Sequence, residues 1–156
     1  MDWQEFENDR YYNIFLIAGG IYLSEQRINL RIEIPAVFTN VTFNTTGGLG
    51  DISTQAEYIF GNHSKCAFIT GITFIFPSAT KDEIGFGKYI ITPLLGGTFS
   101  TDWGFWGLMV RDYYSFAGSK DRMIVHELSL QPLVKLNLGI EWYTIFKPDI
   151  RINWIS

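Results

Sequence analysis

Residues 27–36, RINLRIEIPA, decide the fold class of this chain. Isoleucine, leucine or alanine occupies every even position of the stretch, and arginine, asparagine, glutamate or proline occupies every odd one. Successive side chains of a β-strand point to opposite faces of a sheet, so this alternation produces one apolar and one charged face. A helix would place Arg27 and Arg31 beside apolar residues such as Leu30, without a clean apolar stripe. The stretch therefore predicts a β-strand.

The same period of two recurs along most of the chain. Some segments alternate as clearly as 27–36, and others are rich in β-branched and aromatic residues. Turn-forming stretches such as 46–48 and 147–149 separate them. The expected strands are 11–23, 27–36, 51–60, 66–76, 89–99, 103–114, 123–137, 140–146 and 150–154. Their even spacing predicts about eight to nine antiparallel strands in an up-and-down arrangement, with no helix.

The composition is unusual for a water-soluble domain. Aromatic residues make up 17% of the chain and charged residues only 18%, whereas roughly 25% of residues are charged in ordinary soluble domains. The net charge is −4, and lysine and arginine are scattered, which excludes a nucleic-acid-binding protein. The single cysteine, Cys66, excludes an internal disulfide framework. A length of 156 residues predicts a single domain spanning residues 1–156.

The alternation fits two kinds of barrel. A soluble barrel is apolar inside, whereas a membrane barrel presents its apolar face to lipid and has a polar interior. Aromatic residues near the expected strand ends, among them Trp103, Trp142 and Trp154, match the interfacial girdles of membrane barrels. No stretch is apolar for long enough to form a membrane-spanning helix. We therefore expect an all-β, antiparallel, up-and-down transmembrane β-barrel.

A family resemblance strengthens this expectation. It rests on the following phrases in chain order: GLGDI (48–52), FPSATKDEIGFGKY (76–89), YSFAG (114–118), LQPL (130–133), WY (142–143) and PDIRINW (148–154). Together they resemble the outer-membrane β-barrel porin/transporter family, close to the proteins named for the meta pathway of phenol degradation. The resemblance covers roughly residues 28–154. It implies a Gram-negative outer-membrane barrel that carries small organic compounds.

The chain departs from the family pattern in three respects. Its first residues, MDWQE, are acidic where an export signal would be basic. Further strands and a closing aromatic residue would be expected after Trp154, and Ser78 and Phe86 stand where small or threonine-like residues are usual. We therefore expect a partial barrel, incomplete at both ends, from an outer-membrane protein whose export signal is absent from this chain.

The alternate strand positions that carry polar or charged side chains supply the candidate functional residues. If the apolar face meets lipid, the polar side chains ring the interior, and mixed-sign charges there tune solute selectivity. The candidate lumen-lining residues are Arg27, Arg31, Glu33, Gln55, Glu57, Gln131 and Lys135. Alternatively, they solvate one face of a sheet or pair to plug a narrow barrel. Arg111 and Asp112 lie near the end of the expected strand 103–114, so we expect them at a rim or in a loop.

Catalytic and metal-binding patterns are weak. His126 and Ser129 are three positions apart and would face opposite sides of a regular strand, so they do not form a catalytic pair. Asp51, Asp82 and Glu83 lack the compact spacing of a calcium site. We expect no enzyme activity, no cofactor and no metal.

The leading functional expectation is a passive channel or transporter for small organic solutes. Its partners would be membrane lipid and the solute, with no nucleic acid, and the sequence indicates no oligomeric state. One alternative is a soluble or surface β-barrel that binds an apolar ligand inside. A more distant one is an outer-membrane enzyme that modifies lipids.

Overall fold

The computed structural model describes residues 12–24, 27–40, 45–61, 65–139 and 142–155. Within these ranges the chain forms ten strands and one short 3-10 turn, which confirms the expected all-β fold. The elements are β1 (Tyr12–Leu23), β2 (Ile28–Thr39), β3 (Thr46–Leu49), β4 (Ser53–Phe60), β5 (Cys66–Ile75), η1 (Asp82–Ile84), β6 (Lys88–Thr101), β7 (Gly104–Gly118), β8 (His126–Asn137), β9 (Tyr143–Phe146) and β10 (Ile150–Asn153). Residues 11, 140 and 141, which the sequence assigned to strands, lie outside the described residues.

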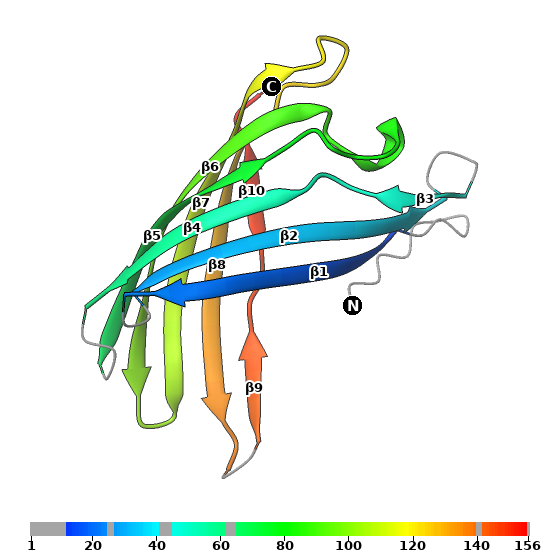
Figure 1. The fold of residues 1–156 in the computed structure, drawn as a ribbon. Helices are drawn as coiled ribbons and strands as arrows, with labels where there is room; N and C mark the ends of the chain where they lie inside the picture. Colours follow the sequence, from blue (N-terminus) through cyan, green and yellow to red (C-terminus); the bar gives the residue numbers. More distant parts are fainter. Residues whose placement is uncertain (1–11, 25–26, 41–44, 62–64, 140–141, 156) are drawn as a thin grey trace.

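Apart from the short strands β3 and β9, each strand of the sheet lies beside the strand that follows it in the sequence. The order is β1-β2-β4-β5-β6-β7-β8-β10, with β3 beside β2 and β9 beside β8, and the pairings are antiparallel. Figure 1 shows that this sheet curls strongly, so that β1 and β2 run at a steep angle to β7 and β8. The fold is a partial up-and-down β-barrel in which β1 and β10 end the path of strands.

The structure corrects several expected boundaries. The strand expected at 103–114 runs from Gly104 to Gly118 as β7. The stretch 46–48, expected as a turn, forms β3, which pairs with the end of β2 beyond the part paired with β4. The break at 147–149 makes no hairpin, because β9 and β10 both pair with β8. At each of these places, two short strands (β3 and β4, or β9 and β10) follow one another along the same neighbouring strand, so the chain does not reverse its direction.

Three of the most deeply buried side chains lie on one face of β6. Ile90, Thr92 and Leu94 alternate along this strand and are 0%, 1% and 3% exposed. β6 lies between β5 and β7 in the sheet, and these three side chains share the face of Arg111 on β7. A second small cluster joins Val37 of β2 to Ile84 of η1, which are both buried beside Gly50.

Asp51 holds the connection 76–87 against β3 and β4. Its side chain is buried and accepts hydrogen bonds from the N–H of Ala79 at 3.0 Å and the N–H of Phe86 at 2.6 Å. A buried carboxylate is stable when backbone donors satisfy it in this way. Asp51 therefore ties a loop to the sheet.

Gly104, at the start of β7, provides a test of this packing. Its φ is +152°, and an added Cβ would lie 1.9 Å from the carbonyl oxygen of Lys135 on β8. We expect Gly104→Ala to lower the free energy of unfolding by about 1–3 kcal/mol, because the backbone of β7 or β8 must shift. Urea unfolding in detergent micelles, followed by tryptophan fluorescence, measures the change.

Gly19 of β1 is the matched control, because a Cβ added there meets no heavy atom within 4 Å. Gly19→Ala should leave the stability unchanged or raise it slightly, since alanine restricts the unfolded chain. Equal unfolding midpoints for the two variants would contradict the close approach at Gly104.

Candidate functional site

The strand register separates the side chains into two faces. Arg31 lies opposite Gln55, Gln55 opposite Thr73, and Thr73 opposite Thr92, so one polar row crosses four strands. The adjacent row is apolar: Leu30 lies opposite Ala56, and both side chains point to the other face. The period of two seen in the sequence thus extends across the whole sheet.

The polar face is the concave one. β2 and β7 are separated in the sheet by β4, β5 and β6. Nevertheless, the ammonium group of Lys147 lies within electrostatic range of both Arg31 on β2 and Arg111 on β7. Side chains on strands so far apart approach one common group only when they point into the hollow of the curl. The face of Arg31 and Arg111 therefore lines the inside.

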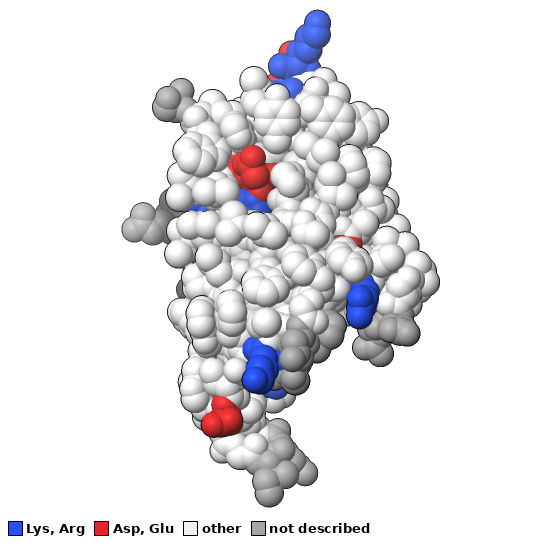
Figure 2. Space-filling view, turned by 90° about the vertical axis from the view of Figure 1, so that its left-hand side faces the viewer, with Lys and Arg blue, Asp and Glu red and all other residues white. Residues whose placement is uncertain are grey.

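The convex face is apolar and largely uncovered. Ile17 is 66% exposed, Leu95 60% and Leu108 46%, and each points to this face. Seen from the left-hand side of Figure 1, most of the surface is uncharged, and acidic and basic side chains show only at a few scattered places (Figure 2). A sheet of a soluble protein would cover such a surface.

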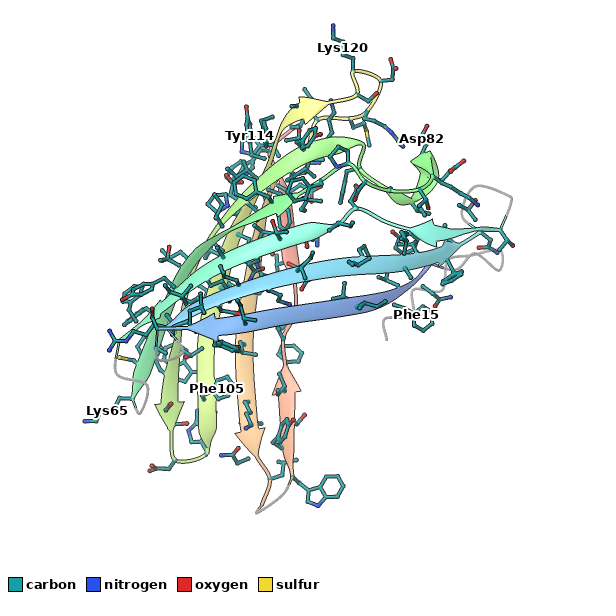
Figure 3. The ribbon with its side chains drawn as sticks, viewed as in Figure 1. Phe15, Lys65, Asp82, Phe105, Tyr114 and Lys120 are labelled. Carbon is teal, nitrogen blue, oxygen red and sulfur yellow. The ribbon has the colours of Figure 1, made fainter. Side chains whose placement is uncertain are left out.

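Aromatic side chains form two rows on the convex face. Ring centroids 4.8–6.0 Å apart connect neighbouring members of a row near the β6–β7 turn, here called the turn-side belt. The turn-side belt consists of Tyr58, Phe60, Phe68, Phe99 and Trp106. The loop-side belt, at the opposite strand ends, consists of Phe76, Tyr89, Phe116, Tyr114, His126 and Trp154. Figure 3 shows Tyr114 of this second belt on the outside of the curl.

One wall of the concave face carries two groups of paired polar side chains, which together are called the first network. The Arg31 guanidinium pairs with the Glu33 carboxylate at 2.6 Å. On the neighbouring rows, the carboxylate of the buried Glu57 accepts hydrogen bonds from the amides of Asn29, at 2.9 Å, and Gln55. Four predicted residues, Arg31, Glu33, Gln55 and Glu57, are therefore brought together on β2 and β4.

The opposite wall carries a second network on β7, β8 and the final strands. Arg151 pairs with Asp149 at 3.0 Å and with Glu127 at 3.6 Å. The Asp149 carboxylate also accepts a hydrogen bond from the hydroxyl of Ser129, which is fully buried. Gln131, the fifth predicted residue, accepts a hydrogen bond from Arg111 on this wall.

The two remaining predicted residues lie near the turns. Lys135 is opposite Phe105 in the register, and its ammonium lies 5.8 Å from that ring and 4.4 Å from the ring of Tyr143. Arg27 is exposed at the β1–β2 turn, where its carbonyl accepts a hydrogen bond from Ile59. Arg27 therefore does not join the networks of the concave face.

The expectation that Arg111 and Asp112 lie at a rim or in a loop is wrong. Both lie within β7, because this strand continues to Gly118. Arg111 faces the hollow, opposite Leu94 and Ser129. Asp112 faces outward, where its carboxylate lies 3.6 Å from the His126 imidazole. Continuing the alternation past Tyr114 would have revealed this placement.

Sequence reasoning also missed several members of the second network. Asp149 and Arg151 were treated as part of a turn and of a short terminal strand, and Lys147 as a turn residue. The sequence did indicate that residues 149 and 151 face the same side, because they are two positions apart. It could not indicate their partners on β8, because these depend on how the strands pair in the sheet. His126 and Ser129 were predicted to face opposite sides. The register confirms this, with His126 opposite Tyr114 and Ser129 opposite Arg111.

In the described ranges, no three histidine, cysteine, aspartate or glutamate side chains are grouped so that they could hold a metal ion. In the same ranges, no helix is both long and apolar enough to cross a membrane.

Glu57 provides a test of the first network. Glu57→Ala removes the acceptor for the Asn29 and Gln55 amides, so we expect the free energy of unfolding to fall by about 1–3 kcal/mol. Glu57→Gln keeps one acceptor oxygen, so it should lower the free energy of unfolding by less than Glu57→Ala does. Urea unfolding of both variants in detergent micelles measures the difference, and an unchanged midpoint for Glu57→Ala would contradict a stabilising role.

Comparison with known proteins adds no relative: no family model matches the chain, and no curated protein or solved structure matches it. What the chain can do therefore follows from its own two faces. One is an apolar convex surface with two aromatic belts, and the other is a charged concave surface with paired walls.

Proposed function

We propose that this chain forms the wall of an outer-membrane β-barrel channel of the Gram-negative type, through which small organic solutes diffuse. One observation carries the proposal: the apolar face of the sheet is convex and the charged face is concave. Water disfavours such an arrangement, because each large apolar side chain left exposed forgoes about 1.5–3 kcal/mol. Lipid on the convex side removes this cost and is the expected partner there.

The two aromatic belts support the same placement. Trp106 of the turn-side belt and Phe116 of the loop-side belt are both on β7. Their ten-residue separation corresponds to about 33 Å along a strand at roughly 3.3 Å per residue. With a strand tilt of roughly 40°, the belts are about 25 Å apart along the barrel axis, which matches the apolar band of membrane barrels. The belts would then lie at the two membrane surfaces.

The concave face would serve as the wall of the solute path. Its charges have mixed sign and stand on facing walls, so they set a transverse field that discriminates among solutes. Passage by diffusion requires only that solutes bind weakly enough to leave. Because unpaired strand edges are costly in lipid, β1 and β10 must pair in the membrane, with each other or with further strands.

The soluble alternative needs the reverse arrangement. A barrel that stores an apolar ligand in water has an apolar interior and a polar exterior. The residues RINLRIEIPA of 27–36 do not favour it, since Leu30 and Ile32 are 37% and 45% exposed on the convex face while Arg31 and Glu33 pair on the concave one.

A pair of threonines on β5 tests which face meets lipid. Thr70 is exposed on the convex face, and Thr73 lies on the concave face. In phospholipid vesicles we expect Thr70→Arg to lower the free energy of unfolding by about 2–4 kcal/mol, the cost of a cation facing the middle of the bilayer. Thr73→Arg should cost less, because its side chain remains in water. Equal losses in the two variants would contradict a lipid-facing convex surface.

Solute entry tests the channel directly. The chain is refolded into phospholipid vesicles, and vesicle swelling in arabinose reports the entry of a small neutral solute. We expect faster swelling than in protein-free vesicles and no swelling with a large dextran, since passage is limited by the width of the path. A chain that stays monomeric and folded in water without detergent, and that leaves arabinose outside the vesicles, would overturn the proposal.

A further inference from the structure

Three cations of the concave face have no acidic partner within the described residues: Lys135, which lies against the rings of Phe105 and Tyr143, and Arg111 and Lys147. Arg111 donates a hydrogen bond to the neutral amide of Gln131, and Lys147 makes no ion pair within 4.0 Å. Arg111 and Arg31 also lie within electrostatic range of the Lys147 ammonium. This part of the hollow therefore holds two cations, Arg111 and Lys147, with which no carboxylate of the described residues pairs.

The acidic groups nearby are already satisfied. Glu33 pairs with Arg31, and Asp149 and Glu127 pair with Arg151. The carboxylate of Glu57 accepts hydrogen bonds from two amides. These carboxylates would have to leave their partners to neutralise Arg111 or Lys147. A carboxylate supplied from outside would not.

A pocket opens beside these two cations. It has a volume of about 200 Å³ and lies among β4, β5, β6, β7 and β8. Lys147 and Gln131 form its polar part. Ile59, Ile69, Met109 and Leu133 form its aliphatic wall, and all four point to the concave face. Arg111 reaches the polar part through its hydrogen bond to Gln131.

We propose that this pocket binds small organic carboxylates with an aliphatic body. The carboxylate would lie between Lys147 and Arg111, where charge-assisted hydrogen bonds are strong. The aliphatic body would pack against Ile59, Ile69 and Met109, which removes apolar surface from water. The inference rests on the proposed channel and names the class of solute that it prefers.

The same chemistry predicts which molecules the pocket rejects. An amide of the same shape leaves both cations without a charged partner, so it should bind more weakly. A carboxylate without an apolar body gains nothing from the aliphatic wall. An organic cation meets repulsion from Lys147 and Arg111. The preferred ligand must therefore carry both a negative charge and an apolar body.

The probes are hexanoate, hexanamide and acetate, and the full chain in detergent micelles is titrated by saturation-transfer difference NMR. Binding is measured directly because protonated hexanoic acid crosses bilayers without a channel. At pH 7 hexanoate is ionised. We expect hexanoate to bind about tenfold or more tightly than hexanamide, and more tightly than acetate. Equal affinities for hexanoate and hexanamide would overturn the proposal.

Variants locate the site. Lys147→Gln and Arg111→Gln should each weaken hexanoate binding about tenfold, and Lys147→Glu should abolish it, while hexanamide binding changes little. Lys120→Gln, exposed in the β7–β8 turn and outside the pocket lining, is the control and should bind hexanoate like the parent chain. Far-ultraviolet circular dichroism checks that each variant retains its strands. Folded Lys147 and Arg111 variants with the parent's hexanoate affinity would refute the assignment.

The vesicle assay separates this proposal from the channel itself. Arabinose entry without any preference for hexanoate in micelles would retain the channel and overturn the carboxylate pocket. Hexanoate binding that depends on Lys147, in a chain that admits no arabinose, would retain the pocket and overturn the channel.

Discussion

The antiparallel register between β2 and its neighbours is the constraint on which the rest of the structure depends. It places Arg31 and Glu33 on one face and Leu30 and Ile32 on the other. Since the side-chain period of a strand is two, a slip of one residue would turn every charged side chain of β2 to the convex surface. Both polar networks and both aromatic belts exist only because this alternation is continued from strand to strand across the sheet.

Curvature then gives the two faces different roles. Where β6 lies between its neighbours, Ile90, Thr92 and Leu94 are buried almost completely, and a register shift between Tyr89 and Ile90 interrupts the regular ladder against β7. Bulges of this kind bend a strand and increase its twist. The curl brings β2 and the chain around Lys147 to opposite sides of one hollow, although they are far apart along the sheet. The same curl spreads the apolar side chains over the outside.

The charges of the hollow fall into two groups with different consequences. Arg31 and Arg151 are held by carboxylates on their own walls, so their main effect is on the structure of those walls. Arg111 and Lys147 lack such partners in the described part of the chain, and an aliphatic pocket opens beside them. A charged pair that neutralises itself offers little to a passing anion, whereas an unpaired cation beside apolar surface selects for amphipathic anions. Selectivity would therefore arise from the few charges that the fold leaves unmatched.

The sequence by itself determined the strands and the two sets of side chains that share a face, because the period of two is a local property of an extended backbone. Thus 27–36 predicted both its strand and the common face of Arg31 and Glu33, and His126 and Ser129 were correctly placed on opposite faces. Only the tertiary structure decided which face is concave, because alternation is the same for an inward and an outward apolar face. It also decided the partners of Arg111, Lys147 and Asp149, since each depends on strands that are distant in the sequence and meet only in the curled sheet.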